Sequence, residues 1–186
     1  MPLIRETIVV TADAQGKPHI APLGLIGQGE HWVIAPFRPS TTLENLRQRP
    51  TATANLTDDA RVFAGCLTGR RDWPLVATRE GFPPRLASTL AHWELEAVEV
   101  REHAERPRFV CRVAGREAHA PFQGFNRAFA AVVEAAVLAS RLGMIPLAQI
   151  EAEFARLKVI VGKTAGPSEA EAFGWLEAKV AEHECR

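Results

Sequence analysis

The sequence lacks an excess of charge of either sign. Its 186 residues include 22 Lys plus Arg and 22 Asp plus Glu, so no net field attracts nucleic acid or an anionic membrane. It also lacks a long apolar run, because the longest one, residues 128–139, is too short to span a bilayer and contains Glu134. A basic segment followed by an apolar one, the pattern of a secretory signal, is missing from the first residues. These absences predict a cytoplasmic protein that binds neither nucleic acid nor membrane.

Residues that commonly hold metals or form disulfides are few and dispersed. The three cysteines, Cys66, Cys111 and Cys185, are an odd number without metal-type spacing, so we expect scattered thiols in a reducing compartment. No two of the six histidines stand four residues apart, and the sequence therefore predicts no metal site. Walker loops, dinucleotide fingerprints, Ser/His/Asp orders and paired-carboxylate motifs are missing too. Any enzymatic chemistry would then depend on a cofactor that the protein positions.

The sequence contains 47% apolar residues, enough to form a hydrophobic core. The first two thirds of the chain show the periodicity of β-strands. Alternating apolar residues between turn signals predict six strands, near residues 4–10, 18–26, 32–35, 51–57, 90–101 and 108–119. Thr41 is expected to cap a short helix that ends near Arg47, with Glu44 reaching back to the cap. Residues 60–67 are a second helical piece.

The periodicity becomes helical after about residue 122. Helices are predicted at 125–142 and 147–159, and a capping box at Ser168 opens a third. Residues 68–86, rich in Gly and Pro, are interpreted as a long loop or lid. We therefore expect an α+β protein with a β-rich domain at 1–121 and a helical C-terminal subdomain at 122–186.

The strongest local signal for a ligand is the turn that leads into the first helix. Arg38, Ser40, Thr41 and Thr42 stand where a strand delivers the chain to a helix N-terminus, and unpaired amides and the helix dipole favour an anion there. The hydroxyls add donors, and Arg38 can make a charge-assisted contact. The alternative is that a hydroxyl simply caps the helix and Arg38 is solvated.

Four segments carry a resemblance to a known family. IRETIVVTADAQGKPHIAPLGLIG (4–27), RPSTTLENL (38–46), ATANLTDD (52–59) and GFNRAFAAVVEAAVLASRL (124–142) resemble an uncharacterised family, domain of unknown function 447, with archaeal and methylotroph members. That family belongs to the FMN-binding split-barrel, flavin reductase-like superfamily. The resemblance implies an antiparallel split β-barrel that binds FMN, followed by a helical segment.

The resemblance also implies where FMN would bind. In split-barrel flavoproteins the second strand lies along the isoalloxazine edge, which implies residues 19–23 here, with His19, Ala21 and Pro22 as the candidate contacts. The turn after the third strand binds the phosphate, which implies Ser40, Thr41 and Thr42, with Arg38 as an additional contact. Asn55 in the fourth strand is a further polar candidate. Pro22 fits an edge or bulge, because it cannot donate a ladder hydrogen bond, and His19 is equally compatible with an exposed strand residue.

A second group of candidates lies outside the strands. Arg127, Glu134 and Arg141 are seven residues apart and share one face of a largely apolar helix. They could face a ligand or partner, or pair with one another, and Arg127 is the best candidate for an anion. Cations and aromatics also occur together at 70–73 and 82–85, where a substrate lid or a solvated loop would use them.

Two classes of function follow from these observations. The first is a flavin-dependent oxidoreductase, homodimeric by resemblance, that acts on an unknown small-molecule substrate and has a possible link to tetrahydromethanopterin-dependent one-carbon metabolism. The second is a non-catalytic module that binds flavin or another phosphorylated ligand and acts through protein partners. A barrel that has lost its flavin and serves a structural role is a third alternative.

Overall fold

The computed structural model describes residues 1–184, which form two compact units. The barrel unit comprises residues 1–57 and 73–121, and the helical unit comprises residues 58–72 and 122–186. This grouping differs from the division expected at residue 121, because residues 58–72 belong with the C-terminal helices. A helical piece inserted between two strands buries its apolar face against other helices, and sequence order does not reveal that partner.

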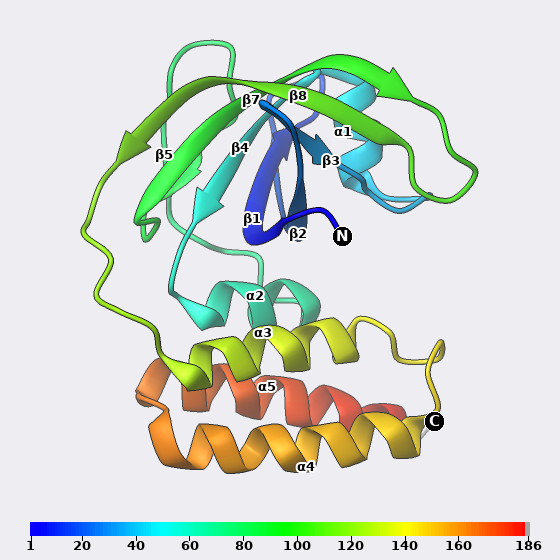
Figure 1. Cartoon of the computed structure of the whole chain (residues 1–186), viewed down its shortest axis with the longest axis vertical. Coiled ribbons are helices and arrows are strands. Elements are labelled where there is room, and N and C mark those ends of the chain that lie inside the picture. The colour runs from blue at the N-terminus through cyan, green and yellow to red at the C-terminus, as the bar shows by residue number, and fades with distance from the viewer. Residues whose placement is uncertain (185–186) are drawn as a thin grey trace. The chain divides into compact units, whose positions relative to one another are not determined.

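Six long strands of the barrel unit close into an antiparallel barrel in the order β1-β2-β3-β8-β7-β4 (Figure 1). The strands are β1 (Ile4–Ala12), β2 (Pro18–Gln28), β3 (His31–Ile34), β4 (Thr51–Leu56), β7 (Ala91–Arg101) and β8 (Arg108–Ala118). Every pair of neighbours is antiparallel, and the short turns of the β1–β2, β2–β3 and β7–β8 hairpins require this for three of the pairs. The barrel and the helices that follow it confirm the predicted α+β fold.

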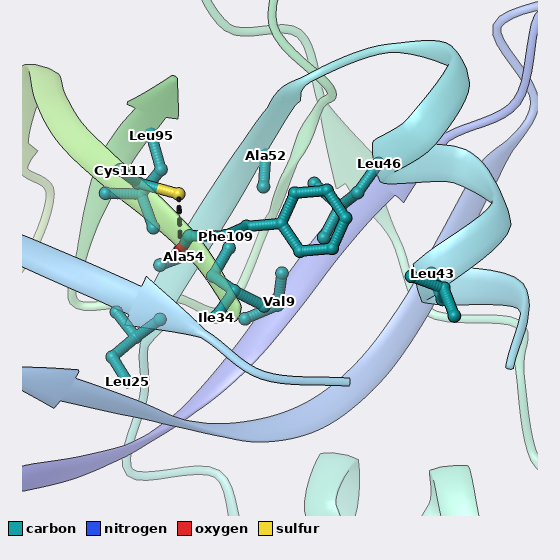
Figure 2. Close-up of a cluster of buried hydrophobic side chains, with 10 residues drawn as sticks. All are labelled: Val9, Leu25, Ile34, Leu43, Leu46, Ala52, Ala54, Leu95, Phe109 and Cys111. Carbon is teal, nitrogen blue, oxygen red and sulfur yellow. Dashed lines mark hydrogen bonds between the residues drawn. The ribbon is translucent and has the colours of Figure 1, made fainter. Parts of the chain in front are cut away.

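The barrel core is built from the side chains that alternate inward along the strands, closed at one end by α1 (Thr41–Gln48). Figure 2 shows Phe109 at its centre, with Leu46 of α1 directed toward the ring. Buried Asn45 of α1 donates to Thr11 Oγ1 of β1 at 3.1 Å. This bond satisfies two buried polar groups and fixes the helix on the barrel.

The segment between α2 (Ala60–Leu67) and β7 is held against the barrel by hydrogen bonds. It contains the short strands β5 (Leu75–Val76) and β6 (Arg85–Leu86), which pair with each other. Thr53 Oγ1 donates to the carbonyl of Pro83, and the amide of Leu86 donates to Asn55 Oδ1 at 2.8 Å. Residues 83–86 are therefore held by buried side chains of β4, so this part of the expected lid is an ordered cover.

The helical unit packs four helices, with α3 in contact with the other three. They are α2 (Ala60–Leu67), α3 (Arg127–Ala139), α4 (Leu147–Thr164) and α5 (Pro167–Glu184). The capping box predicted at Ser168 was misplaced: the side chain that reaches back is that of Glu169, whose Oε2 accepts from the amide of Gly166 at 2.8 Å. Pro167 occupies the first turn, where no amide is required. Among residues 1–184, no helix is both long and apolar enough to cross a membrane.

Candidate functional site

Strand β2 has an open edge for most of its length. Its residues Pro18 to Ile26 pair with β1 on one side, but β3 covers only residues 26–28 on the other. Residues 18–25 thus have no strand partner on that second edge within the described part of the chain. An open edge presents backbone N–H and C=O groups that can bind a ligand.

The ladder pattern identifies which residues of β2 turn their backbone groups to this edge. Gly27 N–H donates to Leu3 C=O at 2.8 Å, and Asp13 N–H donates to Lys17 C=O at 3.1 Å. Because hydrogen-bonded pairs alternate in an antiparallel ladder, the odd residues of β2 bond to β1. The even residues therefore face outward: Ile20, Pro22 and Gly24. Pro22 costs no ladder bond there, which explains how a proline is tolerated.

The predicted residues of β2 consequently have different roles. His19 and Ala21 direct their backbone groups toward β1, opposite Thr11 and Val9. Only Pro22 of the three predicted residues offers a backbone group, its carbonyl, at the open edge. Sequence reasoning included Ile20 only within the segment 19–23 and missed Gly24, because the parity of the ladder depends on the turn that joins the two strands.

The turn before α1 has the geometry of an anion site, with its cap one residue earlier than predicted. Ser40, not Thr41, is the N-cap, and its Oγ accepts from the amide of Leu43 at 3.3 Å. Thr41 and Thr42 are then the first two helical residues, whose amides have no acceptor within the helix. Thr41 is exposed, whereas Thr42 is buried. The helix contacts both β1 and β2, so the predicted turn and strand lie in one unit.

The charges around this turn favour an anion, although Arg38 is not free. Arg38 Nη2 lies 2.9 Å from Glu102 Oε2, and Arg47 Nη2 lies 2.9 Å from Glu102 Oε1. One carboxylate thus neutralises only one of two guanidinium charges. Arg106 donates to the carbonyl of Ala35 and lies over the ring of Phe37. The β7–β8 turn therefore supports the connection between β3 and α1 and surrounds it with cations.

Asn55 serves the fold in this structure. It is fully buried, its Nδ2 donates to the carbonyls of Ile8 and Thr53, and its Oδ1 accepts from Leu86. Both amide hydrogens are used, and we leave Asn55 out of the candidate site.

Arg127 belongs to the helical unit and therefore to no site within the barrel unit. It is the first residue of α3, after the N-cap Asn126. Arg127, Glu134 and Arg141 are all exposed, and no ion pair joins them among the described residues. Arg141 lies beyond the end of α3, which is shorter than predicted. Of the alternatives left open by the sequence, pairing of Glu134 with the two arginines is not formed within the described residues of this chain.

The two cation–aromatic groups at 70–73 and 82–85 have separate surroundings. Arg70 lies over the ring of Trp175, 4.1 Å from its centroid, within the helical unit. Phe82 lies under Arg79, at 4.7 Å, within the barrel unit. Each of the two arginines therefore has an aromatic partner within its own unit.

A second polar cluster, which sequence reasoning missed, lies on β7 and the end of β8. His92 is buried, and its Nδ1 lies 2.8 Å from Nε2 of His119. Burial and the neighbouring His119 lower the pKa of His92, while Glu94 opposes them. A usable signal was the alternation of Glu117 and His119, which places both side chains on one face of a strand.

Two family models match the chain. Residues 5–120 match the model described as the N-terminal domain of a protein of unknown function, DUF447, and residues 126–178 match a second DUF447 model. No curated protein sequence matches the chain significantly.

Solved structures resemble the chain in fold. The FMN-bound protein MM1853 from Methanosarcina mazei, assigned to DUF447, has a TM-score of 0.83 over 96% of both chains, at 21% identity. An FMN-binding protein from Thermus thermophilus with bound p-hydroxybenzaldehyde has a TM-score of 0.54, 17% identity, and coverage of 67% of this chain and 77% of its own. The 2-nitrobenzoate 2-nitroreductase NbaA from Pseudomonas fluorescens has a TM-score of 0.53 and 17% identity, and the match covers 64% of this chain and 66% of NbaA. These likenesses confirm the split-barrel fold.

Proposed function

Because the chain belongs to the DUF447 family, whose two domain models cover most of its length, we propose that its barrel unit binds FMN and that the protein is a flavin-dependent oxidoreductase. The membership confirms the family resemblance of the four sequence segments. FMN is the ligand named for the solved DUF447 relative from M. mazei and for the T. thermophilus protein of the same fold.

The observation that carries the proposal is the open edge of β2. A planar heterocycle with donors and acceptors along its rim requires backbone groups that no neighbouring strand occupies. Residues 18–25 supply such an edge, and the outward groups belong to Ile20, Pro22 and Gly24. This row of backbone groups fits the flavin ring, because it offers both N–H donors and C=O acceptors in fixed positions.

The phosphate would bind at the start of α1. The amides of Thr41 and Thr42, the exposed hydroxyl of Thr41 and the positive end of the helix dipole all favour a dianion. Arg38 and Arg47 add a net positive charge after their shared pairing with Glu102. Ser40 would act indirectly, because its hydroxyl accepts from Leu43 and holds the first turn in shape.

Bound FMN supplies hydride and single-electron transfer, which no side chain can perform. The protein would orient the ring along β2, hold the phosphate at α1 and admit a small substrate. Support for a reductase activity comes from fold-level likeness to NbaA. The link to tetrahydromethanopterin-dependent metabolism stays a prediction, as does a cytoplasmic location.

A homodimer is part of this proposal. Exposed aliphatic side chains lie on the barrel strands or beside them, among them Leu3, Ile4, Val98 and Val100, each at least 47% exposed. Exposed aliphatic residues of this size are typical of association surfaces when they are contiguous. Light scattering coupled to size exclusion tests the proposal, and a monomer at micromolar concentration would contradict it.

The visible spectrum of the purified protein, before and after addition of FMN, tests flavin binding. We expect oxidised flavin absorbance near about 450 nm, a property of the cofactor, and saturable binding. Thr41→Val should weaken FMN binding by about 1–3 kcal/mol, the cost of one lost hydrogen bond to a charged group. Ser88→Ala is the control, because it removes an exposed hydroxyl elsewhere in the barrel unit. No binding at micromolar FMN would refute the proposal, and equal affinities of Thr41→Val and wild type would refute the phosphate position.

Reduction of the bound flavin separates the oxidoreductase from the passive module. Anaerobic NADH or NADPH should bleach the absorbance of bound FMN, and an acceptor should restore it. If FMN binds but neither nicotinamide bleaches it and no reduced acceptor forms after photoreduction, the non-catalytic alternative is favoured.

A further inference from the structure

Strand geometry brings three potential metal ligands onto one face of the β7–β8 ladder. His92 of β7 lies directly opposite Glu117 of β8. Side chains two residues apart in an extended chain point to the same side, and His119 follows Glu117 by two. The amide of His119 also donates to the carbonyl of Leu90 at 2.8 Å, which continues the ladder past the end of β8. The backbone of two paired strands therefore fixes the origin of all three side chains.

The three side chains converge at their tips. One ligand atom from each of His92, Glu117 and His119 lies within 4.8 Å of the other two. The two imidazole planes are nearly parallel, with an interplanar angle of 3°, and Nδ1 of His92 shares a hydrogen bond with Nε2 of His119 at 2.8 Å. Two nitrogens bound to one Zn²⁺, each at about 2.0–2.1 Å, stand only slightly farther apart than this.

The opposite side of His92 has a partner of the kind that metal-bound histidines use. Its Nε2 lies 3.9 Å from Oε1 of Glu94, a buried carboxylate. Glu94 is held by Arg79, whose Nη2 lies 3.1 Å away and whose amide donates at 3.2 Å. A carboxylate near the second ring nitrogen favours the tautomer that leaves Nδ1 as the ligand atom.

Gly115 makes room for this carboxylate. A Cβ atom at Gly115 would lie 2.4 Å from Oε2 of Glu94, far inside van der Waals contact. Any other residue would displace the buried carboxylate from its place behind His92. Glycine at position 115 is therefore needed to leave space for Glu94 beside His92 and His119.

We propose that His92, Glu117 and His119 form a binding site for a single divalent transition-metal ion such as Zn²⁺. Two imidazole nitrogens and one carboxylate oxygen suit Zn²⁺ and its neighbours better than Ca²⁺ or Mg²⁺, which prefer oxygen ligands. The metal replaces the proton shared by the two histidines, and Glu117 supplies negative charge. Because Glu117 is exposed and His119 is half-buried, the remaining coordination positions face solvent. Three protein ligands with an open position are typical of zinc sites that bind a further small ligand.

Isothermal titration with Zn²⁺ tests the site on the full chain after treatment with a chelator. We expect one ion per chain with micromolar or tighter affinity. His119→Gln should lower the Zn²⁺ affinity by about 100-fold or more, because the loss of even a partner outside the ligand shell lowers metal affinity by about 10–100-fold. Glu94→Gln should weaken it by about 10-fold. His92 is left unchanged, because its substitution removes a buried side chain.

His31→Gln is the matched control, since it removes a half-buried histidine elsewhere in the barrel unit. Circular dichroism and melting temperatures without metal establish that each variant is folded. Zn²⁺ affinity that is equal in wild type and His119→Gln would overturn the proposal, because the ion would then bind elsewhere, for example at a thiol. The absence of any Zn²⁺ heat with the wild-type chain would also overturn it, and the cluster would be only a hydrogen bond between two strands.

Discussion

Two strands of equal length in the barrel unit, β2 and β7, differ in how their edges are used. Residues 91–96 of β7 pair with β4 on one edge and with β8 on the other. Residues 18–25 of β2 pair with β1 alone. The main chain of β7 is therefore fully occupied over this stretch, whereas one row of backbone groups of β2 is available.

This difference determines what each strand can offer to a ligand. A strand paired on both edges can act only through its side chains, and β7 contributes His92 and Glu94 to the proposed metal site. A strand with an open edge can act through its main chain, and the residue types along β2 then matter less than their parity. This explains why Ile20 and Gly24, with no polar side-chain atom, belong to the proposed FMN site.

The largest effect that we expect comes from proline on the paired edge of β2. Ala21→Pro removes an amide that bonds to β1 and should lower the free energy of unfolding by about 3 kcal/mol or more. Ile20→Pro removes an amide on the open edge. It should cost no more than about 1 kcal/mol beyond Ile20→Ala, because no ladder bond is lost. Urea denaturation of the FMN-free protein measures both.

Equal destabilisation by the two prolines would contradict the parity assigned to β2. Ile20→Pro also tests the ligand: if FMN uses the open edge, this variant should bind it more weakly than Ile20→Ala does. The comparison of stability and affinity in one variant separates the fold of β2 from its proposed function.

A second prediction concerns the cover that β4 holds in place. Asn55→Ala leaves the amide of Leu86 and the carbonyl of Ile8 without their buried partner. Buried unsatisfied groups cost about 1–3 kcal/mol each, and we expect a loss of about 2–3 kcal/mol in unfolding free energy. Thr57→Ala, just beyond the end of β4 and less buried than Asn55, should cost less. Faster amide exchange at Leu86 in Asn55→Ala than in wild type is the local readout, and unchanged exchange would contradict the fastening role.

The smallest effect that we expect is a pH dependence of the unfolding free energy. It comes from a thiol in the part of β8 that is paired on both edges. Cys111 lies between β3 and β7, and burial raises the pKa of its thiol to about 12. The folded state keeps this proton above pH 9, where the unfolded state releases it. Its stabilising contribution is therefore complete well below about pH 8.5. Above that pH it is lost progressively, at a rate that approaches about 1.4 kcal/mol per pH unit.

Comparison with Cys111→Ala isolates the contribution of this thiol, since the ionisation of lysines changes the unfolding free energy of both proteins equally. The free energy of unfolding of wild type should fall by about 1 kcal/mol more than that of Cys111→Ala between pH 8.5 and pH 9.5. Parallel curves would mean that the thiol titrates normally. Cys66, in α2 of the helical unit, has a pKa raised by burial to about 11 and contributes to both curves. Cys185 lies outside the described residues.

Strand positions were predictable from sequence because each strand has its own alternation and its own turn signals. The first helix was predictable as well, but its cap moved from Thr41 to Ser40. Several hydroxyl residues in succession can all act as caps, and the choice depends on how the chain leaves β3. The exposed Arg127, Glu134 and Arg141 were harder to interpret, because a charged stripe looks the same whether it faces a partner or water.

The sequence by itself determined the order of the six barrel strands and of the helices along the chain, the family, and the turn of Ser40, Thr41 and Thr42, because these depend on residues close together in the chain. The short strands β5 and β6 were not predicted. Only the tertiary structure decided which edge of β2 stays open, that Asn55 is consumed by the fold, and that His92 meets His119 across 27 positions. Pairing partners far apart in the chain set all three results. Ladder parity and side-chain convergence are properties of two strands together, and neither strand contains them alone.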